Sequence, residues 1–275
     1  MAGTLVVGCG GPGRSSVQRL ASEGYTCLTV DWTNADLELL PPELTEAEAK
    51  SDSETAERLL RVRRNEISLN MKGFSEVVLL TNLGGALGSV CIPLISECAK
   101  ENDCRFIVVL TIPFAFEETR REAALAVLPS ISSLADRTFV MDLQYSGVDS
   151  MVLSDALAAV DGLFCIAART VSDLIGSIPF MSTFTDRMYS FSRGYGDTQL
   201  ESLDACIRKP FFNVSRATNW KLVICSDGPV GDLEREAITA TATRMNGALP
   251  QIIEGRGTGS GLTVFIPIFP TSPRT

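Results

Sequence analysis

The sequence predicts an α/β fold built on a parallel, doubly wound sheet. Apolar runs of strand length alternate along the chain with segments of helical spacing, which is the pattern of βαβ units. Two of the runs lead directly into glycine-rich turns, and a long apolar helical pattern follows later. We expect an N-terminal domain over residues 1–153, a central helix over 154–178, and a loop with a smaller C-terminal α/β domain over 179–275.

The composition excludes several classes of protein. The 275 residues carry a net charge of −9, which argues against a nucleic-acid binder or a basic membrane-surface helix. The chain has no histidine, so no imidazole serves catalysis or a metal, and we expect no metal site. The eight cysteines form no CxxC pair and are expected as free thiols. The apolar runs fall short of the about 18 residues of a membrane span, so we expect a cytoplasmic protein without direct membrane insertion.

The first strand leads into the first glycine turn. Leu5–Val7 is a short apolar run, followed by Gly8-x-Gly10-x-x-Gly13 and by Ser15-Ser16, which can cap the next helix. Glycines let an anion approach free backbone N–H groups at a helix start, which a Cβ would prevent. By itself the motif fits a Rossmann dinucleotide site, a nucleoside triphosphate site or a structural turn.

Four further apolar runs extend the predicted sheet. Two of them end at an acid, Asp31 and Asp142, at the position where ligands are contacted in parallel sheets. The charged stretch 37–64 is expected to form a loop and one exposed helix. The four runs are Tyr25–Val30, Val77–Leu80, Phe106–Leu110 and Phe139–Leu143.

A second glycine-rich turn follows the run Val77–Leu80. The stretch Thr81–Ser89 holds Gly84, Gly85 and Gly88 and leads into an apolar helix. Two such turns are more informative than one, because each can offer N–H donors to one polyphosphate from opposite sides. The sequence therefore predicts a nucleotide-binding sheet in the N-terminal domain.

The second half of the chain begins with the long helix. Its apolar residues cover most of its surface between Ser154 and Ile178, which predicts a buried helix between two domains. A loop over 179–186, a short element over 187–191 and an amphipathic helix over 199–208 follow. The C-terminal domain is predicted to contain a strand over Trp220–Cys225, a helix over Glu234–Asn246 and a strand over Gly261–Pro267. Two additional strands are predicted over Phe211–Val214 and Pro250–Ile253.

The order of these features resembles the FtsZ branch of the FtsZ/tubulin superfamily, over almost the whole chain. The most specific piece is Pro113-Phe114-Ala115-Phe116-Glu117-x-x-x-Arg121. The resemblance implies that Glu117 and Arg121 contact the sugar region of GTP or GDP, with Mg²⁺ as a companion ion. The alternative is that the two phenylalanines are core residues and that Glu117 and Arg121 form an i,i+4 surface pair.

Both glycine turns depart from the family pattern. In the first, Pro12 has no N–H to donate, and Arg14 adds a positive charge that can offset the loss. In the second, Leu87 replaces a threonine whose hydroxyl is expected near the terminal phosphate, so we expect weaker triphosphate binding or a preference for a diphosphate. The resemblance implies these nucleotide-binding residues: Gly10, Gly11, Gly13, Arg14, Ser15, Gly84, Gly85, Ala86, Leu87, Gly88, Ser89, Glu117, Arg121 and Asp161.

Asp161 is the candidate for reading the base. The family reads the guanine edge with an Asn-Asp pair on the central helix, and these positions fall on Asp161 and Gly162. One carboxylate can accept the N1 and N2 hydrogens of guanine, whereas adenine offers no such pair of donors. A carboxylate on an apolar helix is costly to bury without a partner. The alternative is that Asp161 lies on an exposed stripe.

The loop after the central helix is implied to enter the nucleotide site of a neighbouring subunit. The family pattern Asn-x-Asp-x-x-Asp becomes Met181-x-Thr183-x-x-Asp186, which leaves Asp186 as the acid and Thr183 as a second candidate for orienting water. Because each such polar group is typically worth about 10²-fold in rate, we expect hydrolysis to be slow or absent. Asp186 can equally be a helix cap.

Three functions follow from these residues. The first is a divergent FtsZ-like guanine-nucleotide-binding protein that self-assembles head to tail into a dimer or filament, with a division or membrane-remodelling partner and no nucleic acid. The second is a non-hydrolysing scaffold that binds little or no nucleotide. The third is a Rossmann oxidoreductase with Asp31 on a ribose, which leaves the second turn and the Pro-Phe-x-Phe-Glu stretch unexplained.

Overall fold

The computed structural model describes residues 3–145, 152–208, 222–255 and 260–268, and it confirms the parallel, doubly wound sheet. Ten described strands form one sheet in the order β3-β2-β1-β4-β5-β6-β7-β10-β8-β9. Neighbours from β3 to β7 are parallel, while β10 is antiparallel to β7 and β8. The strands are β1 (Thr4–Cys9), β2 (Cys27–Asp31), β3 (Leu37–Glu38), β4 (Glu76–Asn82), β5 (Arg105–Ile112), β6 (Arg137–Asp142), β7 (Met188–Gly194), β8 (Val223–Ser226), β9 (Gln251–Glu254) and β10 (Leu262–Pro267).

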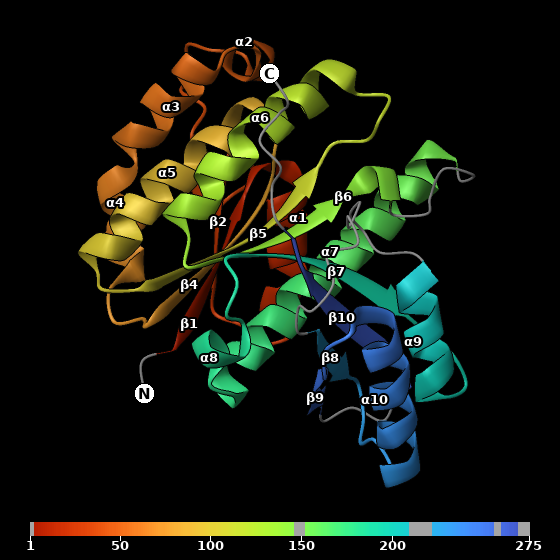
Figure 1. The fold of residues 1–275 in the computed structure, drawn as a ribbon. Helices are drawn as coiled ribbons and strands as arrows, with labels where there is room; N and C mark the ends of the chain where they lie inside the picture. Colours follow the sequence, from red (N-terminus) through yellow and green to blue (C-terminus); the bar gives the residue numbers. More distant parts are fainter. Residues whose placement is uncertain (1–2, 146–151, 209–221, 256–259, 269–275) are drawn as a thin grey trace.

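Helices cover both faces of the parallel part of the sheet (Figure 1). Successive side chains of β1 show why, because Leu5 and Val7 enter one hydrophobic core and Val6 enters the other. The first core lies under α5 and its neighbours, and the second lies under α1 and α7. The helices of these layers are α1 (Gly10–Ser22), α2 (Glu46–Ser51), α3 (Ser53–Val62), α4 (Arg64–Met71), α5 (Ala86–Glu101), α6 (Glu118–Leu134) and α7 (Leu153–Ser177).

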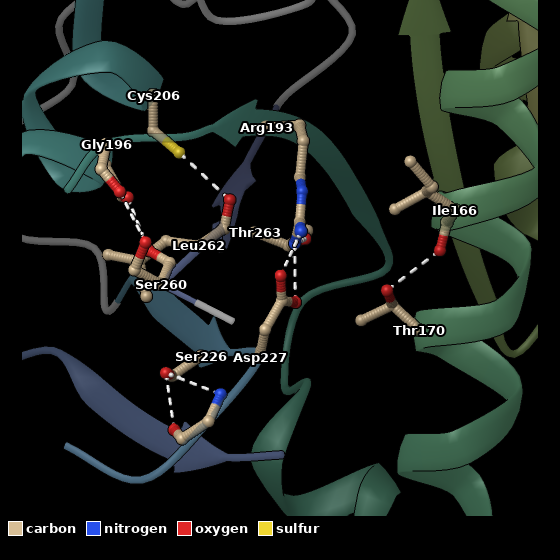
Figure 2. Close-up of polar contacts among 12 residues, drawn as sticks. Ile166, Thr170, Arg193, Gly196, Cys206, Ser226, Asp227, Ser260, Leu262 and Thr263 are labelled. Carbon is tan, nitrogen blue, oxygen red and sulfur yellow. Dashed lines mark hydrogen bonds and ion pairs between the residues drawn. The ribbon is translucent and has the colours of Figure 1, made fainter. Parts of the chain in front are cut away.

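The predicted long helix is confirmed as α7. Phe164 and Val171 are fully buried in the core that α7 shares with α1. Thr170 keeps its hydroxyl satisfied inside the helix, because it donates to the carbonyl oxygen of Ile166 at 2.8 Å (Figure 2). None of the described helices is both long and apolar enough to span a bilayer.

The C-terminal strands are held together by polar contacts as well as by an apolar core. Arg193 of β7 donates to Asp227, which follows β8, at 2.8 Å and to Thr263 of β10 at 3.0 Å (Figure 2). The Arg193 side chain is only 7% exposed, so this fork ties three strands where little water competes. The remaining helices are α8 (Phe180–Thr183), α9 (Gln199–Arg208) and α10 (Asp232–Asn246), with a 3-10 turn η1 (Leu143–Tyr145) after β6.

Several local predictions are corrected by the structure. The serine cap at Ser15-Ser16 is wrong, because Gly10 adopts a φ of +74° and the chain enters α1 directly from β1. The stretch 37–64 forms β3 and two helices, α2 and α3, and ends at the first residue of α4, since Leu59 and Leu60 pack into the core. A short helix, α8, lies within the loop predicted over 179–186. The predicted strand Phe211–Val214 lies outside the described residues.

The packing of α1 on β4 generates the first testable prediction. A Cβ on Gly13 would lie 2.3 Å from the Leu80 carbonyl oxygen, whereas a Cβ on Gly11 would have no described atom within 4 Å. Gly13→Ala is therefore expected to lower the free energy of unfolding by about 1–3 kcal/mol, because α1 must move away from β4.

Chemical denaturation of the two variants measures this difference. Gly11→Ala is the matched control and is expected to leave the stability unchanged or slightly increased, because alanine is the better helix former. Equal stabilities for Gly13→Ala and the wild-type protein would show that α1 does not pack on β4 this closely.

Candidate functional site

The two predicted glycine turns lie side by side. β1 and β4 pair in parallel, so their carboxyl ends meet at one edge of the sheet. The Thr81 hydroxyl donates to the carbonyl oxygen of Cys9 at 3.2 Å, which ties the end of β4 to the end of β1. The structure thus brings Gly10–Ser15 and Gly84–Ser89 to one place.

Asn82 lies between the two turns. Its Oδ1 is 3.5 Å from the point where a Cβ on Gly10 would stand, and its Nδ2 is 3.6 Å from the corresponding point at Gly85. The glycine pattern alone gives Asn82 no role, although its position at the end of a parallel strand is a signal for ligand contact.

The second turn can be formed only with glycine at two of its positions. Gly84 has a φ of +78°, and a Cβ there would lie 2.4 Å from the Arg120 carbonyl oxygen. A Cβ on Gly88 would lie 1.7 Å from the carbonyl oxygen of Asn82. Both residues hold the start of α5 against the backbone of β4 and α6, so the turn is fixed by close main-chain contacts.

Two helices begin at these turns without a side-chain cap. α1 starts at Gly10 after Cys9, and α5 starts at Ala86 after Gly85; neither preceding residue caps its helix through a side chain in the part of the chain that is described. The first N–H groups of both helices are therefore available to an anion, and both helix dipoles favour negative charge there. Pro12 falls in the first turn of α1, where a missing N–H removes no helical hydrogen bond.

Leu87 does not face a ligand at this edge. Its side chain is 4% exposed and belongs to the hydrophobic core. Ser89, two residues further along α5, is partly exposed. The position of the expected threonine hydroxyl is thus filled by a packed apolar group, and any replacement for that hydroxyl must come from another element.

The sequence of the chain is similar to those of FtsZ proteins. No known family model matches the chain. It is 25% identical to cell division protein FtsZ 2 of Methanocaldococcus jannaschii over 187 residues, and 25% identical to cell division protein FtsZ 1 of Halobacterium salinarum over 257 residues. These alignments cover 62% and 83% of this chain, but 49% and 65% of the relatives, so the chain spans from about half to about two thirds of their length.

Solved structures of FtsZ and CetZ share the fold of this chain. An FtsZ dimer of M. jannaschii superposes with a TM-score of 0.77 at 20% identity, over 96% of this chain and 87% of that chain. The chain is a divergent FtsZ-like protein. A protofilament of CetZ2 from Haloferax volcanii, solved with GTPγS, also shares the fold, with a TM-score of 0.75 at 13% identity over 96% of this chain and 91% of that chain.

Arg14 of this FtsZ-like protein bridges α1 and the end of β2. Its Nη1 donates to the Thr33 carbonyl oxygen at 2.6 Å and lies 3.4 Å from Asp31 Oδ2. Burial raises the pKa of Asp31, against the lowering effects of the Trp32 N–H and of Arg14. Because the Asp31 carboxylate is buried and already contacted, it is poorly placed for a ribose, which weakens the oxidoreductase alternative.

The Pro-Phe-x-Phe-Glu stretch supplies two arginines with different roles. Arg121 forks onto Asp142 at 2.6 and 2.7 Å and donates to the Pro113 carbonyl oxygen at 2.8 Å. These bonds to Asp142 raise the pKa of the Arg121 guanidinium and fix it at the end of β6. The alternative of a Glu117–Arg121 surface pair is wrong, since Glu117 pairs with Arg120.

Arg120 is a further functional candidate that the motif itself does not indicate, although it stands next to Arg121. Its Nε donates to the Gly84 carbonyl oxygen at 3.1 Å, and its Nη1 contacts the Glu117 carboxylate. Arg120 therefore connects the second glycine turn to the residue that is expected at the nucleotide sugar.

Asp161 lies on α7, partly buried. Loss of water raises the pKa of its carboxyl, and Arg19 of α1 lowers it in part. Gly162 is the other position expected to face guanine. A Cβ added at Gly162 would have no described atom within 4 Å. The carboxylate is half-buried, so its exposure agrees fully neither with a buried residue that reads the base nor with a residue on an exposed stripe.

Thr183 and Asp186 lie at the opposite edge of the sheet from the glycine turns. Arg137, the first residue of β6, donates to the Met181 carbonyl oxygen at 3.1 Å and so marks this edge. Thr183 is 3% exposed and accepts a hydrogen bond from Gln251 at 3.2 Å. Asp186 accepts from the Tyr189 hydroxyl at 3.3 Å, and the helix-cap alternative is wrong because strand β7 follows it.

No resident metal centre is formed by the described residues, which contain no group of three or more His, Cys, Asp or Glu side chains arranged to hold an ion. A Mg²⁺ ion would therefore have to enter with the phosphates of a nucleotide and be held largely by them and by water, as this ion commonly is.

Asp161 provides a prediction on stability and pH. A carboxyl whose pKa is raised in the folded state contributes stability below the unfolded pKa of about 3.9, and that contribution is lost as the pH rises through the folded pKa. Asp161→Asn removes this cost, so the ligand-free variant is expected to melt at a higher temperature than the wild-type protein at pH 7, with the difference vanishing below about pH 4.

Thermal melts across this pH range check the expectation. Asp155→Asn is the control, because Asp155 is exposed on the same helix and in its first turn, where a negative charge is favourable. A lower melting temperature for Asp161→Asn at pH 7 would mean that a favourable contact with Arg19 outweighs the loss of water.

Proposed function

We propose that this FtsZ-like protein binds GTP or GDP between the two glycine turns. The observation that carries the proposal is the meeting of two uncapped helix starts at neighbouring parallel strands, with Asn82 between them. One diphosphate or triphosphate can then accept N–H groups from both sides. The curated relatives are named cell division proteins, and the CetZ2 protofilament was solved with GTPγS, which supports this ligand class.

Guanine is the base that the site fits best. The Asp161 carboxylate is already partly desolvated in the free protein, as its raised pKa indicates. A base that donates two hydrogen bonds to this carboxylate would therefore offset the cost of its burial. Glu117 would face the sugar with its second carboxylate oxygen while its Oε1 keeps the contact with Arg120, and Arg121 would hold the motif in place through Asp142.

We also propose that copies associate head to tail into a filament or dimer that acts in cell division or membrane remodelling. The turns and the loop 179–186 lie at opposite edges of the sheet, so a heterologous contact would place the loop of one copy over the turns of the next. This proposal includes the predicted division of the chain into an N-terminal domain (1–153), a central helix (154–178) and a C-terminal part (179–275). In this division the nucleotide site belongs to the first part and the loop belongs to the third, with α7 between them in the chain.

Hydrolysis by such an assembly is expected to be slow. Met181 is apolar, and Thr183 is buried and bonded to Gln251, so neither side chain is free to orient water. Asp186 remains, partly exposed and in contact with the Tyr189 hydroxyl. Positioning of water and stabilisation of charge provide most of the catalysis in phosphoryl transfer, and one acid provides little of either.

Turnover and assembly can be measured together. Phosphate release from GTP and sedimentation of the full chain are expected to show assembly with turnover about 100-fold or more below that of an FtsZ that keeps all three polar groups. Asp186→Ala is expected to lower the residual turnover by about 10-fold or more while GTP binding and sedimentation persist.

Asp232→Ala provides the matched control, because Asp232 is an exposed acid at the start of α10. Turnover as fast as that of an FtsZ with the complete pattern would contradict the proposed role of the loop. Assembly without any binding of GTP or GDP would instead support a scaffold that needs no nucleotide.

A further inference from the structure

Two side-chain donors converge above Gly85 in the second turn. The point where a Cβ would stand on Gly85 is 3.6 Å from Asn82 Nδ2 and 3.8 Å from Arg120 Nη2. Because Gly85 has no side chain, this space is left for a ligand atom. Gly85 also precedes α5, so the first N–H groups of that helix lie beside the same space.

Arg120 is held over the turn by contacts that leave part of its fork unused. Its Nε donates to the Gly84 carbonyl oxygen at 3.1 Å, and its Nη1 contacts Glu117. Among the described residues, Nη2 has no hydrogen-bond partner. The side chain is 47% exposed, so a ligand can reach it. A guanidinium presents its donors in a fixed plane, and the two existing contacts therefore direct the third group.

Asn82 adds a second donor to the same space. Its amide extends between Gly10 and Gly85, and it forms no side-chain hydrogen bond with another described residue. A phosphate on Gly85 would thus meet an amide from the end of β4 and a guanidinium from the first turns of α6.

We propose that Arg120 and Asn82 hold the terminal phosphate of GTP and make the site prefer GTP to GDP, in place of the weaker triphosphate binding or preference for a diphosphate that Leu87 predicts from the sequence alone. They would replace the hydroxyl that is absent at Leu87, whose side chain is packed in the core. This inference rests on the proposed binding of a guanine nucleotide between the turns. It assigns the discrimination between triphosphate and diphosphate to two side chains outside the glycine motifs themselves.

A purely structural role for Arg120 makes a different prediction. An exposed Arg–Glu pair at i,i+3 contributes little to stability, and the bond to Gly84 would shape the turn equally for either nucleotide. Loss of such a role would weaken GTP and GDP binding by the same factor. A direct contact to the terminal phosphate weakens only the ligand that carries that phosphate.

Equilibrium titration of the full chain with GTPγS and with GDP, in EDTA to remove divalent ions, separates the two roles. Arg120→Gln is expected to weaken GTPγS binding by about 10-fold or more and GDP binding by less than about 3-fold, because one charge-assisted contact is lost. Arg120→Lys keeps the charge without the planar fork and is expected to fall between Arg120→Gln and the wild-type protein.

Asn82→Asp is a second variant with nearly the same shape. It replaces an amide donor by a negative acceptor and is expected to weaken GTPγS more than GDP. Arg244→Gln is the matched control for the loss of one positive charge, because Arg244 is exposed in the last turn of α10; it is expected to leave the ratio of the two dissociation constants unchanged.

Equal losses for GTPγS and GDP in Arg120→Gln would overturn the inference while the nucleotide site itself stands. The same change of ratio in Arg244→Gln would also overturn it, since the effect would then be a general one of charge. If the wild-type chain binds neither nucleotide, both this inference and the proposed function fail.

Discussion

The parallel pairing of β1 with β4 is the constraint on which the rest of the site depends. It sets Gly8 opposite Leu80, so that the chain leaves both strands at the same edge and turns into α1 and α5 side by side. α1 can pack against β4 only because Gly13 lacks a Cβ next to the Leu80 carbonyl oxygen. Two helix starts are thereby fixed by main-chain contacts before any ligand is present, which lowers the ordering cost of binding.

Three arginines of this acidic chain gather at this point. The protein carries a net charge of −9, yet Arg14, Arg120 and Arg121 all lie near the two helix starts, each beside a carboxylate. These pairs hold the guanidinium groups in position and limit the repulsion that arginines would exert on one another. The opposite edge holds the loop 179–186, where Thr183 is buried and Asp186 contacts Tyr189. In the proposed function, binding and hydrolysis would therefore depend on different edges of one sheet.

Local patterns in the sequence predicted most of the strands, α7 and both glycine turns, because a strand, a long apolar helix and a glycine turn are each encoded over a few neighbouring residues. The strands β3 and β7 were not predicted as strands. Contacts between distant residues were not predictable in the same way. The start of α1 was misplaced because Gly10 turns the chain before any serine can cap it. The pairing of Arg121 with Asp142 and the bond from Gln251 to Thr183 join residues far apart in the chain, and the convergence of Asn82 and Arg120 on Gly85 depends on the packing of α6 against the turn.

The structure of the protein crystallised with GDP tests the central claim most directly. The account predicts that the diphosphate lies between residues 10–15 and 84–89, in contact with main-chain N–H groups from the starts of both α1 and α5. A diphosphate bound at one turn alone, or a nucleotide bound at another edge of the sheet, would contradict it.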